Sequence, residues 1–384
     1  MPLTVPLDRA TAAHGGKAAG LGALRRAGLT VPDGFVVPES VTADDLPHAV
    51  GQGLAGLLGA AGETGAVAVR SSATDEDGPR ASAAGQYETV LGCVGVADVV
   101  AGVLACRASA HGPRATAYRA ATAAGELCPG VAVVVQPLVD AGAAGVLFTD
   151  GGHTVIEASW GLGESVVRGA VEPDRFTVAG GAVVDRRVGT KRTRVDRSAS
   201  GTATRDVPLP DQARPCLDDA TVLRLAALGQ QVTDLRGGRQ DVEWAVDDDG
   251  AVWLLQARPV TAPLPAPRGE HDLAHNAGVV LAGTAGSPGR AAGPPRAVRG
   301  PDDFAAVRPG DVLVCRETDP AWTPLFGVAA AVVTETGGLL SHAAIVAREL
   351  GLPAVLGVPG ATDALRGAAT ITVDGDAGTV TPGG

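Results

Sequence analysis

Residues 261–277 (TAPLPAPRGEHDLAHNA) place prolines and charges between two longer stretches of regular apolar patterning. Such residues interrupt both helix and strand patterns, so the segment marks a boundary between two folding units. The chain has 384 residues, which exceeds the usual size of one hydrophobic core. We expect a larger domain at 1–262, a linker at 263–277 and a smaller domain at 278–384.

The composition restricts the classes of partner. A net charge of −11 with a pI near 5.1 argues against binding to nucleic acid or to an anionic membrane, which requires a basic surface. No run of roughly 18 apolar residues occurs and no basic segment precedes an apolar run at the N-terminus, so we expect a soluble, cytoplasmic protein. The five cysteines are odd in number and widely spaced, which predicts reduced thiols without a zinc site.

The larger half mixes helix and strand patterns. A glycine-punctuated turn at 14–22 leads into a short helix that stops at Gly28, and a strand follows near 34–37. Residues 65–70 alternate as a strand, and we expect a polar, flexible segment at 71–86. Residues 131–139 and 144–149 read as neighbouring buried strands.

The clearest local signals lie towards the C-terminus. Residues 218–235 form an amphipathic helix pattern. The segments 241–246 and 252–256 flank the turn Asp247-Asp248-Asp249-Gly250, a strong hairpin signal. Beyond residue 278, short strands alternate with glycine and proline turns around one helix at 341–350.

The sharpest chemical signal is the string TETGGLLSHAAIVARELG at 334–351. Two glycines precede Ser341, which is well placed to cap a helix, and His342 lies in the first turn of that helix. Free backbone N–H groups and the positive end of the helix dipole stabilise a phosphate there, and imidazole is a competent nucleophile near neutral pH. A histidine at a helix start is by itself more often structural, but the complete string favours a phosphoryl carrier.

This string resembles the phosphohistidine signature of the family of pyruvate phosphate dikinase, phosphoenolpyruvate synthase and rifampicin phosphotransferase. The first half is similar to the ATP-grasp half of the same enzymes. The matching pieces occur in family order: GGKAAGLGALRRAGLTVPDGFVV, VRSSATDEDGPRASAAGQYETVL, VVVQPLV with GVLFT, ASWGLGESVV with EPDRF, and DVEWAVDDDGAVWLLQARPVT. The resemblance implies an α/β (α+β) fold, with an ATP-grasp nucleotide-binding domain followed by a smaller phosphohistidine swivelling β/α domain.

The first half carries residues suited to that chemistry. Lys17 and Arg70 can place cations on a triphosphate. Ser71, Ser72 and the segment 81–86 can supply hydroxyls and amides to a phosphate loop. Glu243 and Gln256 face each other across the hairpin as oxygen ligands for Mg²⁺.

Arg258 lies two residues after Gln256 and therefore points to the same sheet face. There it can hold the transferred phosphate. From the residues alone, an ion pair between Glu243 and Arg258 on a solvated face is an equally good interpretation; the resemblance favours the site.

Residue by residue, the resemblance implies catalytic roles for His342, Arg258 and Lys17 and a bound ATP with Mg²⁺. The implied nucleotide contacts are Lys17, Arg70 and Arg258 on phosphate, Gly85 in the loop over the phosphates, Gln136 and Val139 beside the adenine, and Glu243 and Gln256 as metal and phosphate ligands. Glu164 in WGLGE has either a site role or a structural one. Lys191 and Arg192 either reach the phosphates or lie on the surface.

The expected reaction transfers the β-phosphate of ATP through phospho-His342 to a small-molecule acceptor, releasing AMP and phosphate. The family's dikinases and synthases carry a C-terminal barrel for pyruvate after the His domain, where this sequence ends, and its rifampicin enzymes carry an acceptor domain between the two units. The alternative is therefore a subunit of a split system whose acceptor site lies on a partner protein. A regulatory ATP-binding module and an ATP-grasp ligase are weaker alternatives, because neither explains the His342 string.

Overall fold

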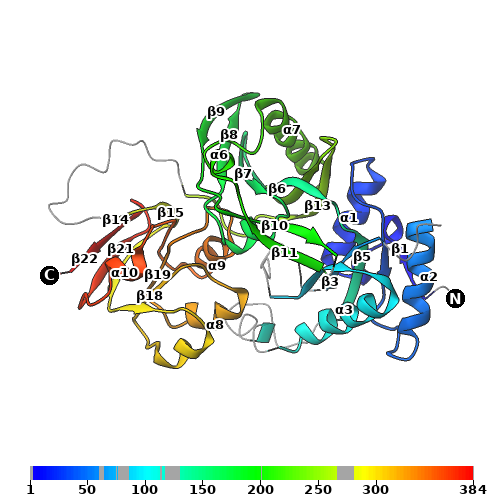
Figure 1. The fold of residues 1–384 in the computed structure, drawn as a ribbon, viewed down its shortest axis with the longest axis horizontal. Helices are drawn as coiled ribbons and strands as arrows, with labels where there is room; N and C mark the ends of the chain where they lie inside the picture. Colours follow the sequence, from blue (N-terminus) through cyan, green and yellow to red (C-terminus); the bar gives the residue numbers. More distant parts are fainter. Residues whose placement is uncertain are drawn as a thin grey trace.

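A computed structural model describes residues 3–59, 65–74, 76, 86–112, 115–116, 130–199, 201–265 and 281–383. We refer to the described residues up to 265 as the N-terminal unit and to 281–383 as the C-terminal unit. Each unit contains its own sheets, and no strand pairing in the described part of the chain joins one unit to the other (Figure 1).

The N-terminal unit begins with a five-stranded sheet, the first sheet, in the order β1-β2-β5-β3-β4. Helices α2 and α3 pack on it through a buried cluster that includes Leu46, Val50, Val99 and Val133. The elements of this part are β1 (Val5–Pro6), η1 (Leu7–Arg9), η2 (Ala12–His14), α1 (Gly16–Arg26), β2 (Phe35–Val37), α2 (Leu46–Leu58), β3 (Val67–Ala73), β4 (Thr89–Cys93), α3 (Gly95–Ser109) and β5 (Val131–Pro137).

A six-stranded antiparallel sheet, the second sheet, follows in the order β13-β12-β6-β7-β8-β9, with a separate β10-β11 hairpin. Helices α1 and α7 share one core with it, in which Leu21, Leu225 and Trp244 are fully buried. The elements are β6 (Ala141–Asp150), β7 (His153–Trp160), α5 (Glu164–Arg168), β8 (Asp174–Ala179), β9 (Ala182–Arg187), β10 (Thr193–Ser198), β11 (Gly201–Asp206), α6 (Leu209–Gln212), α7 (Asp219–Arg236), β12 (Gln240–Asp247) and β13 (Val252–Pro259).

The C-terminal unit contains a mixed sheet β15-β20-β19-β18-β17, parallel from β17 to β20, and an antiparallel sheet β14-β22-β21-β16. Helix α9 packs on the mixed sheet through Ala343, Val346 and Ala347. The elements are β14 (Leu281–Ala282), β15 (Thr284–Ser287), β16 (Arg290–Gly293), β17 (Pro295–Ala297), η5 (Pro301–Ala306), β18 (Val312–Cys315), η6 (Pro320–Trp322), α8 (Thr323–Phe326), β19 (Ala331–Thr334), α9 (His342–Glu349), β20 (Ala354–Leu356), α10 (Ala361–Ala364), β21 (Ile371–Asp374) and β22 (Thr379–Pro382).

Several sequence predictions are confirmed because their signals are local. The helix predicted at 218–235 is α7, and Asp218 caps it by accepting the Thr221 N–H at 2.8 Å. The predicted hairpin forms with Glu243 directly opposite Gln256. Helix α9 begins at His342 with Ser341 at the N-cap position, although the Ser341 hydroxyl donates to Gly338 O at 2.9 Å and does not cap the helix.

Two predictions about the strands were wrong. The strand at 65–70 continues as β3 through Ala73, so Ser71 and Ser72 are buried strand residues and do not begin a flexible loop. The strands predicted at 131–139 and 144–149 are not neighbours: β5 pairs with β2 and β3 in the first sheet, whereas β6 pairs with β12 and β7 in the second. Both segments are apolar, and apolar character does not specify which strand a segment pairs with.

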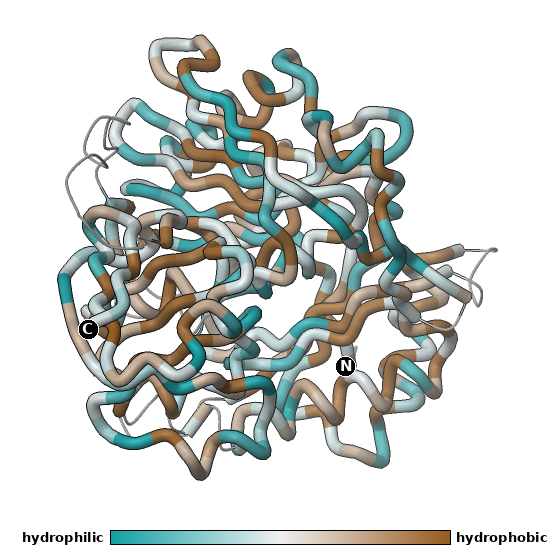
Figure 2. Tube along the Cα trace, turned by 60° about the vertical axis from the view of Figure 1, so that its left-hand side comes forward, coloured by the Kyte–Doolittle hydropathy of each residue, from teal (hydrophilic) through white to brown (hydrophobic). Residues whose placement is uncertain are grey.

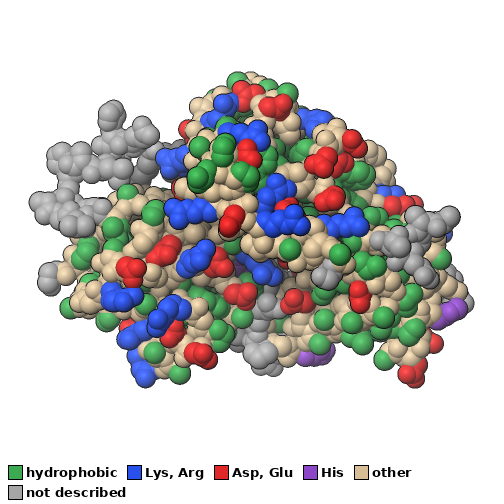
Figure 3. All heavy atoms as spheres, in the orientation of Figure 1, with side chains coloured by type: hydrophobic (Ala, Val, Ile, Leu, Met, Phe, Trp, Pro, Cys, Tyr) green, Lys and Arg blue, Asp and Glu red, His purple; other side chains and the backbone are tan. Residues whose placement is uncertain are grey.

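The expected boundaries at 262 and 277 stay a prediction, because most of the linker lies outside the described residues. Apolar residues concentrate along the strands of both units, and hydrophilic residues along the outer turns (Figure 2). On the face in Figure 3, basic (lysine or arginine) and acidic side chains are interspersed. Among the described residues, no helix has the length and apolar character needed to cross a bilayer.

Candidate functional site

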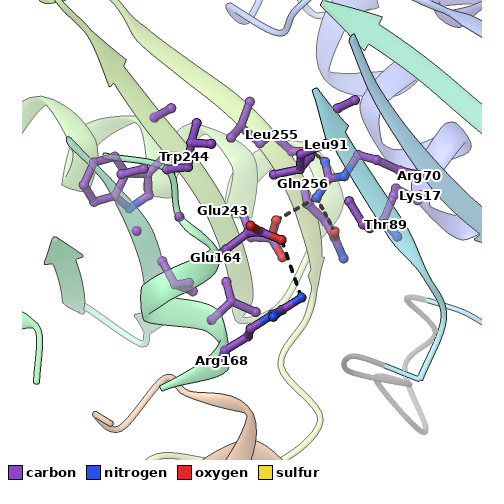
Figure 4. A pocket seen from close by; sticks show the side chains of 18 of the residues that line it. Lys17, Arg70, Thr89, Leu91, Glu164, Arg168, Glu243, Trp244, Leu255 and Gln256 are labelled. Carbon is purple, nitrogen blue, oxygen red and sulfur yellow. Dashed lines mark hydrogen bonds and ion pairs between the residues drawn. The ribbon is translucent and has the colours of Figure 1, made fainter. Parts of the chain in front are cut away.

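One cavity lies where the first sheet, the second sheet and helix α9 meet. Figure 4 shows side chains from both sheets directed into it. Eight residues that the sequence assigned to the site line this cavity: Lys17, Arg70, Gln136, Val139, Glu243, Gln256, Arg258 and His342. Ser71 and Ser72, which the sequence assigned to the phosphate loop, do not line it. Gly85 lies outside the described residues. The fold therefore gathers candidates that are up to 325 positions apart in the sequence.

Arg70 crosses the cavity from β3 to the hairpin of the second sheet. Its Nη2 donates to Glu243 Oε2 at 2.7 Å and to Gln256 Oε1 at 3.1 Å, and its Nη1 donates to Leu255 O. One guanidinium therefore contacts both predicted oxygen ligands (Figure 4). The two oxygens therefore face the same space and contact one cationic group.

Arg258 pairs with Asp241, and the structure thereby corrects the alternative of a Glu243–Arg258 pair. Its Nε and Nη2 each lie 2.7 Å from Asp241 Oδ2, and the two residues are direct partners across the hairpin. Asp241 also lines the cavity, and the sequence analysis missed it. A usable signal was present, because Asp241 precedes Glu243 by two residues and strand alternation places both on one face.

Lys17 is 4% exposed, and its ammonium lies 2.5 Å from Glu76 Oε1 and 3.0 Å from Ser71 O. Glu76, another missed residue, lines the cavity too. The Ser72 hydroxyl accepts the Ala18 N–H at 2.9 Å and donates to His14 O at 2.7 Å. The expectation that Ser72 serves the phosphate loop is therefore wrong: it ties the start of α1 to β3.

Gln136 and Val139 lie at the end of β5, on the cavity wall formed where the chain passes from the first sheet to the second. The Gln136 amide donates to Pro32 O at 2.9 Å. This bond connects the cavity wall to the loop before β2 and so braces the segment.

His342 is 2% exposed and sits at the first position of α9. The Thr318 hydroxyl lies 3.2 Å from His342 Nδ1, and the Phe326 ring packs beside the imidazole with centroids 6.3 Å apart. A bond from Nδ1–H to the Thr318 oxygen leaves the lone pair of the imidazole on Nε2.

The loop before α9 contacts the N-terminal unit. The Gly337 N–H donates to Val171 O at 3.1 Å, and the Thr336 hydroxyl donates to Gly169 O at 2.7 Å. Glu157 on β7 accepts the Leu339 and Leu340 N–H groups at 2.8 and 3.0 Å. These contacts hold His342 at the cavity.

Burial raises the pKa of the Glu157 carboxyl, while the charges of Arg175 and Arg348 and the two N–H donors oppose that rise. The sequence analysis missed Glu157. Its signal was a single acidic residue in the otherwise largely apolar strand HTVIEASW.

Lys191 is fully buried and belongs to a different part of the fold. Its ammonium lies 2.5 Å from Asp174 Oδ1 and 2.9 Å from Gly189 O. Both interpretations left open by the sequence, phosphate contact and surface, are therefore wrong for Lys191. Arg192 is exposed. Glu164 lines the cavity and lies 3.7 Å from Arg168, which also lines it.

Within the described residues, no group of three or more histidine, cysteine, aspartate or glutamate side chains is arranged to hold a metal ion by itself. The convergent oxygens of Glu243 and Gln256 fit Mg²⁺ only as a partial ligand set that phosphate oxygens and water complete, which is the usual mode for this ion.

Comparison with known proteins identifies both units. Residues 38–271 match the family described as pyruvate phosphate dikinase, AMP/ATP-binding domain, and residues 307–378 match the PEP-utilising enzyme, mobile domain. The chain is 40% identical over 333 residues to the probable phosphoenolpyruvate synthase of Pyrococcus abyssi, a match that covers 83% of this chain and 41% of the relative.

The phosphoenolpyruvate synthase of Pseudomonas aeruginosa is 40% identical over 345 residues, covering 83% of this chain and 44% of the relative. The chain thus spans less than half the length of these two relatives. The predicted α/β ATP-grasp fold class is confirmed. This chain belongs to the pyruvate phosphate dikinase AMP/ATP-binding family and joins that domain to a PEP-utilising mobile domain.

Proposed function

We propose that this chain is a dikinase-type phosphotransferase, in which His342 takes the β-phosphoryl group of ATP and passes it to a small-molecule acceptor. The observation that carries the proposal is the shared cavity: His342 lines the same cavity as Lys17, Arg70 and Arg258. A nucleophile and three cations around one space are what phosphoryl transfer to a protein side chain requires.

ATP enters with its adenine against the Gln136–Val139 segment and its phosphates towards the arginines. Arg70 then exchanges the carboxylate of Glu243 for phosphate oxygen, because a guanidinium binds both anions in the same geometry. Arg258, held by Asp241, provides a second bidentate donor. Glu243 and Gln256 would hold Mg²⁺, which when bound neutralises charge on the phosphates.

The His342 nitrogen attacks the β-phosphorus, and the bond from this phosphorus to the AMP oxygen breaks, so AMP leaves. Hydrolysis by one water then releases the γ-phosphate and leaves phospho-His342. We propose that Nδ1–H donates to the Thr318 hydroxyl, which leaves the lone pair for the attack on Nε2. Because Nε2 attacks with its lone pair, the imidazole retains its Nδ1 proton and releases none in this step.

The C-terminal unit then carries the phosphate away from the cavity. The predicted linker of 15 residues, 263–277, spans at most about 50 Å when extended, which permits such a movement. Because relatives are named phosphoenolpyruvate synthase, pyruvate is the first acceptor to test.

The test incubates the protein with Mg²⁺ and ATP labelled at either the β or the γ phosphorus, alongside His342→Ala. Acid-labile β-label on the unmodified protein only, together with AMP, supports the relay. ATP binding without any label rejects the phosphohistidine mechanism.

The same assay addresses the acceptor. Discharge of the label by pyruvate or another small molecule supports complete phosphotransfer by this chain. A stable phospho-His342 that turns over only when cell extract supplies a second protein supports the split-system alternative.

A further inference from the structure

A carboxylate lies at the centre of the contact between the two units. Glu157 is 1% exposed, although it belongs to β7 of the N-terminal unit. Its two oxygens accept the N–H groups of Leu339 and Leu340, at 2.8 and 3.0 Å. One side chain therefore binds the backbone of the other unit at the positions two and three residues before His342.

The neighbouring residues fit this grip closely. A Cβ atom at Gly338 would lie 2.2 Å from Glu157 Oε2, so a glycine is required for the carboxylate to enter the loop. Around it, apolar side chains from both units form one buried cluster: Val146, Phe148, Val166 and Val171 from the N-terminal unit, and Leu340 and Ile345 from the C-terminal unit. Because hydrogen bonds are directional, the carboxylate orients the loop before His342 within an otherwise apolar contact.

A hydrogen-bonded carboxylate suits a contact between two units that must separate during the proposed reaction. A buried carboxylate is costly unless it is hydrogen-bonded, and here it gains two N–H donors and the charges of Arg175 and Arg348. When the units separate, water solvates Glu157 and the two amides. Docking therefore exchanges one set of hydrogen bonds for another, and the contact orients the loop without binding it irreversibly.

We infer that Glu157 is a positioning residue that docks the His342 loop at the ATP cavity. It acts through the backbone of Leu339 and Leu340 and is not among the described residues that line the cavity. The inference rests on the proposed function, since docking serves catalysis only if His342 receives the phosphoryl group there.

The test compares the full chain with Glu157→Gln and Glu157→Asp. Glutamine keeps the length but turns one acceptor into a donor facing an N–H group, and aspartate keeps the charge but is one methylene shorter. We measure hydrogen exchange of a peptide containing Leu339 and Leu340, the dissociation constant for ATP, and the single-turnover rate of His342 labelling at saturating ATP.

In Glu157→Gln we expect the two amides to exchange at least about tenfold faster and His342 to be labelled at least about tenfold more slowly. The dissociation constant for ATP should not change. Glu157→Asp should recover part of both effects. Amide protection and labelling at the original levels in Glu157→Gln would overturn the inference.

Asp174→Asn is the matched control. Asp174 is also fully buried in the second sheet and accepts two backbone N–H groups, from Gly189 and Cys216, but both lie within the N-terminal unit. It should lower the unfolding temperature and leave exchange at Leu339 and Leu340 unchanged. If it also exposed those amides, Glu157 would be only a stabilising residue.

The hydrogen-exchange readout does not depend on activity. If the unmodified protein never labels His342, the proposed function fails, while faster exchange in Glu157→Gln still shows the docking contact. If His342 is labelled at the original rate in every variant, the phosphohistidine relay is supported and the positioning role of Glu157 is rejected.

Discussion

The Arg70 guanidinium donates to the Glu243 carboxylate at 2.7 Å and thereby joins the two sheets that border the cavity. Arg70 belongs to β3 of the first sheet and Glu243 to β12 of the second. The same nitrogen also reaches Gln256, so a phosphate or a metal that enters here competes with an existing ion pair. In the proposed function, nucleotide binding replaces this contact between the sheets with contacts through the ligand.

Arg70→Lys should weaken ATP binding about tenfold, because an ammonium cannot reproduce a bidentate phosphate contact. Calorimetric titration with a non-hydrolysable ATP analogue and Mg²⁺ measures the change. Arg186→Lys is the matched control, since Arg186 forms an exposed pair with Asp219. An equal loss of affinity in both variants would contradict a phosphate role for Arg70.

Thr318→Val should slow labelling of His342 by about ten- to a hundredfold without changing ATP affinity, because it removes the proposed bond from Nδ1–H to the hydroxyl. Thr318→Ser should restore most of the rate. Rapid-quench labelling across pH 6 to 9 is the measurement. A valine variant with the original rate and pH profile would reject the assignment of attack to Nε2.

Gly338→Ala should undock the His342 loop, because the added methyl group meets the Glu157 carboxylate at 2.2 Å. In a Glu157→Asp background the carboxylate is withdrawn, so the same substitution should cost less. The coupling energy from a double-mutant cycle in the labelling rate tests this. Strictly additive effects would mean that the two residues do not meet.

Lys191→Met should lower the free energy of unfolding by about 3–5 kcal/mol, because it leaves the fully buried Asp174 without its ammonium partner. Urea unfolding gives the value. ATP affinity should not change, since Lys191 is not among the described residues lining the cavity. A loss of ATP affinity without a loss of stability would restore a phosphate role.

Alkaline pH should destabilise the fold through Cys106. Burial raises the pKa of this thiol from 9.0 to about 12. The neutral thiol therefore contributes stability fully below pH 9, and this contribution falls, by at most about 4 kcal/mol, as pH rises towards 12. Urea unfolding between pH 8 and 11 should show a flatter decline for Cys106→Ala; parallel curves would contradict the prediction.

Sequence reasoning succeeded for contacts that local patterns fix. An Asp-Gly turn between alternating strands sets the register of a hairpin, so Glu243 opposite Gln256 was predictable. The same strand alternation places Asp241 on the face of Glu243, so Asp241 was predictable as a further site residue. Glu76 was not predictable as the partner of Lys17, because the pair is 59 positions apart and depends on the packing of α1 against β3.

The two kinds of unit, the helix that begins at His342 and the family could all be read from the amino-acid sequence, because they follow from local patterns and ordered motifs. The three-dimensional fold was needed to show that Lys191 forms a core ion pair and that Glu157 holds the loop before His342, whereas the pair of Arg258 and Asp241 lies within the predicted hairpin. The physical reason is that a charge is stabilised by whichever group faces it across the fold. Residue spacing specifies that group within a helix or hairpin but not between sheets.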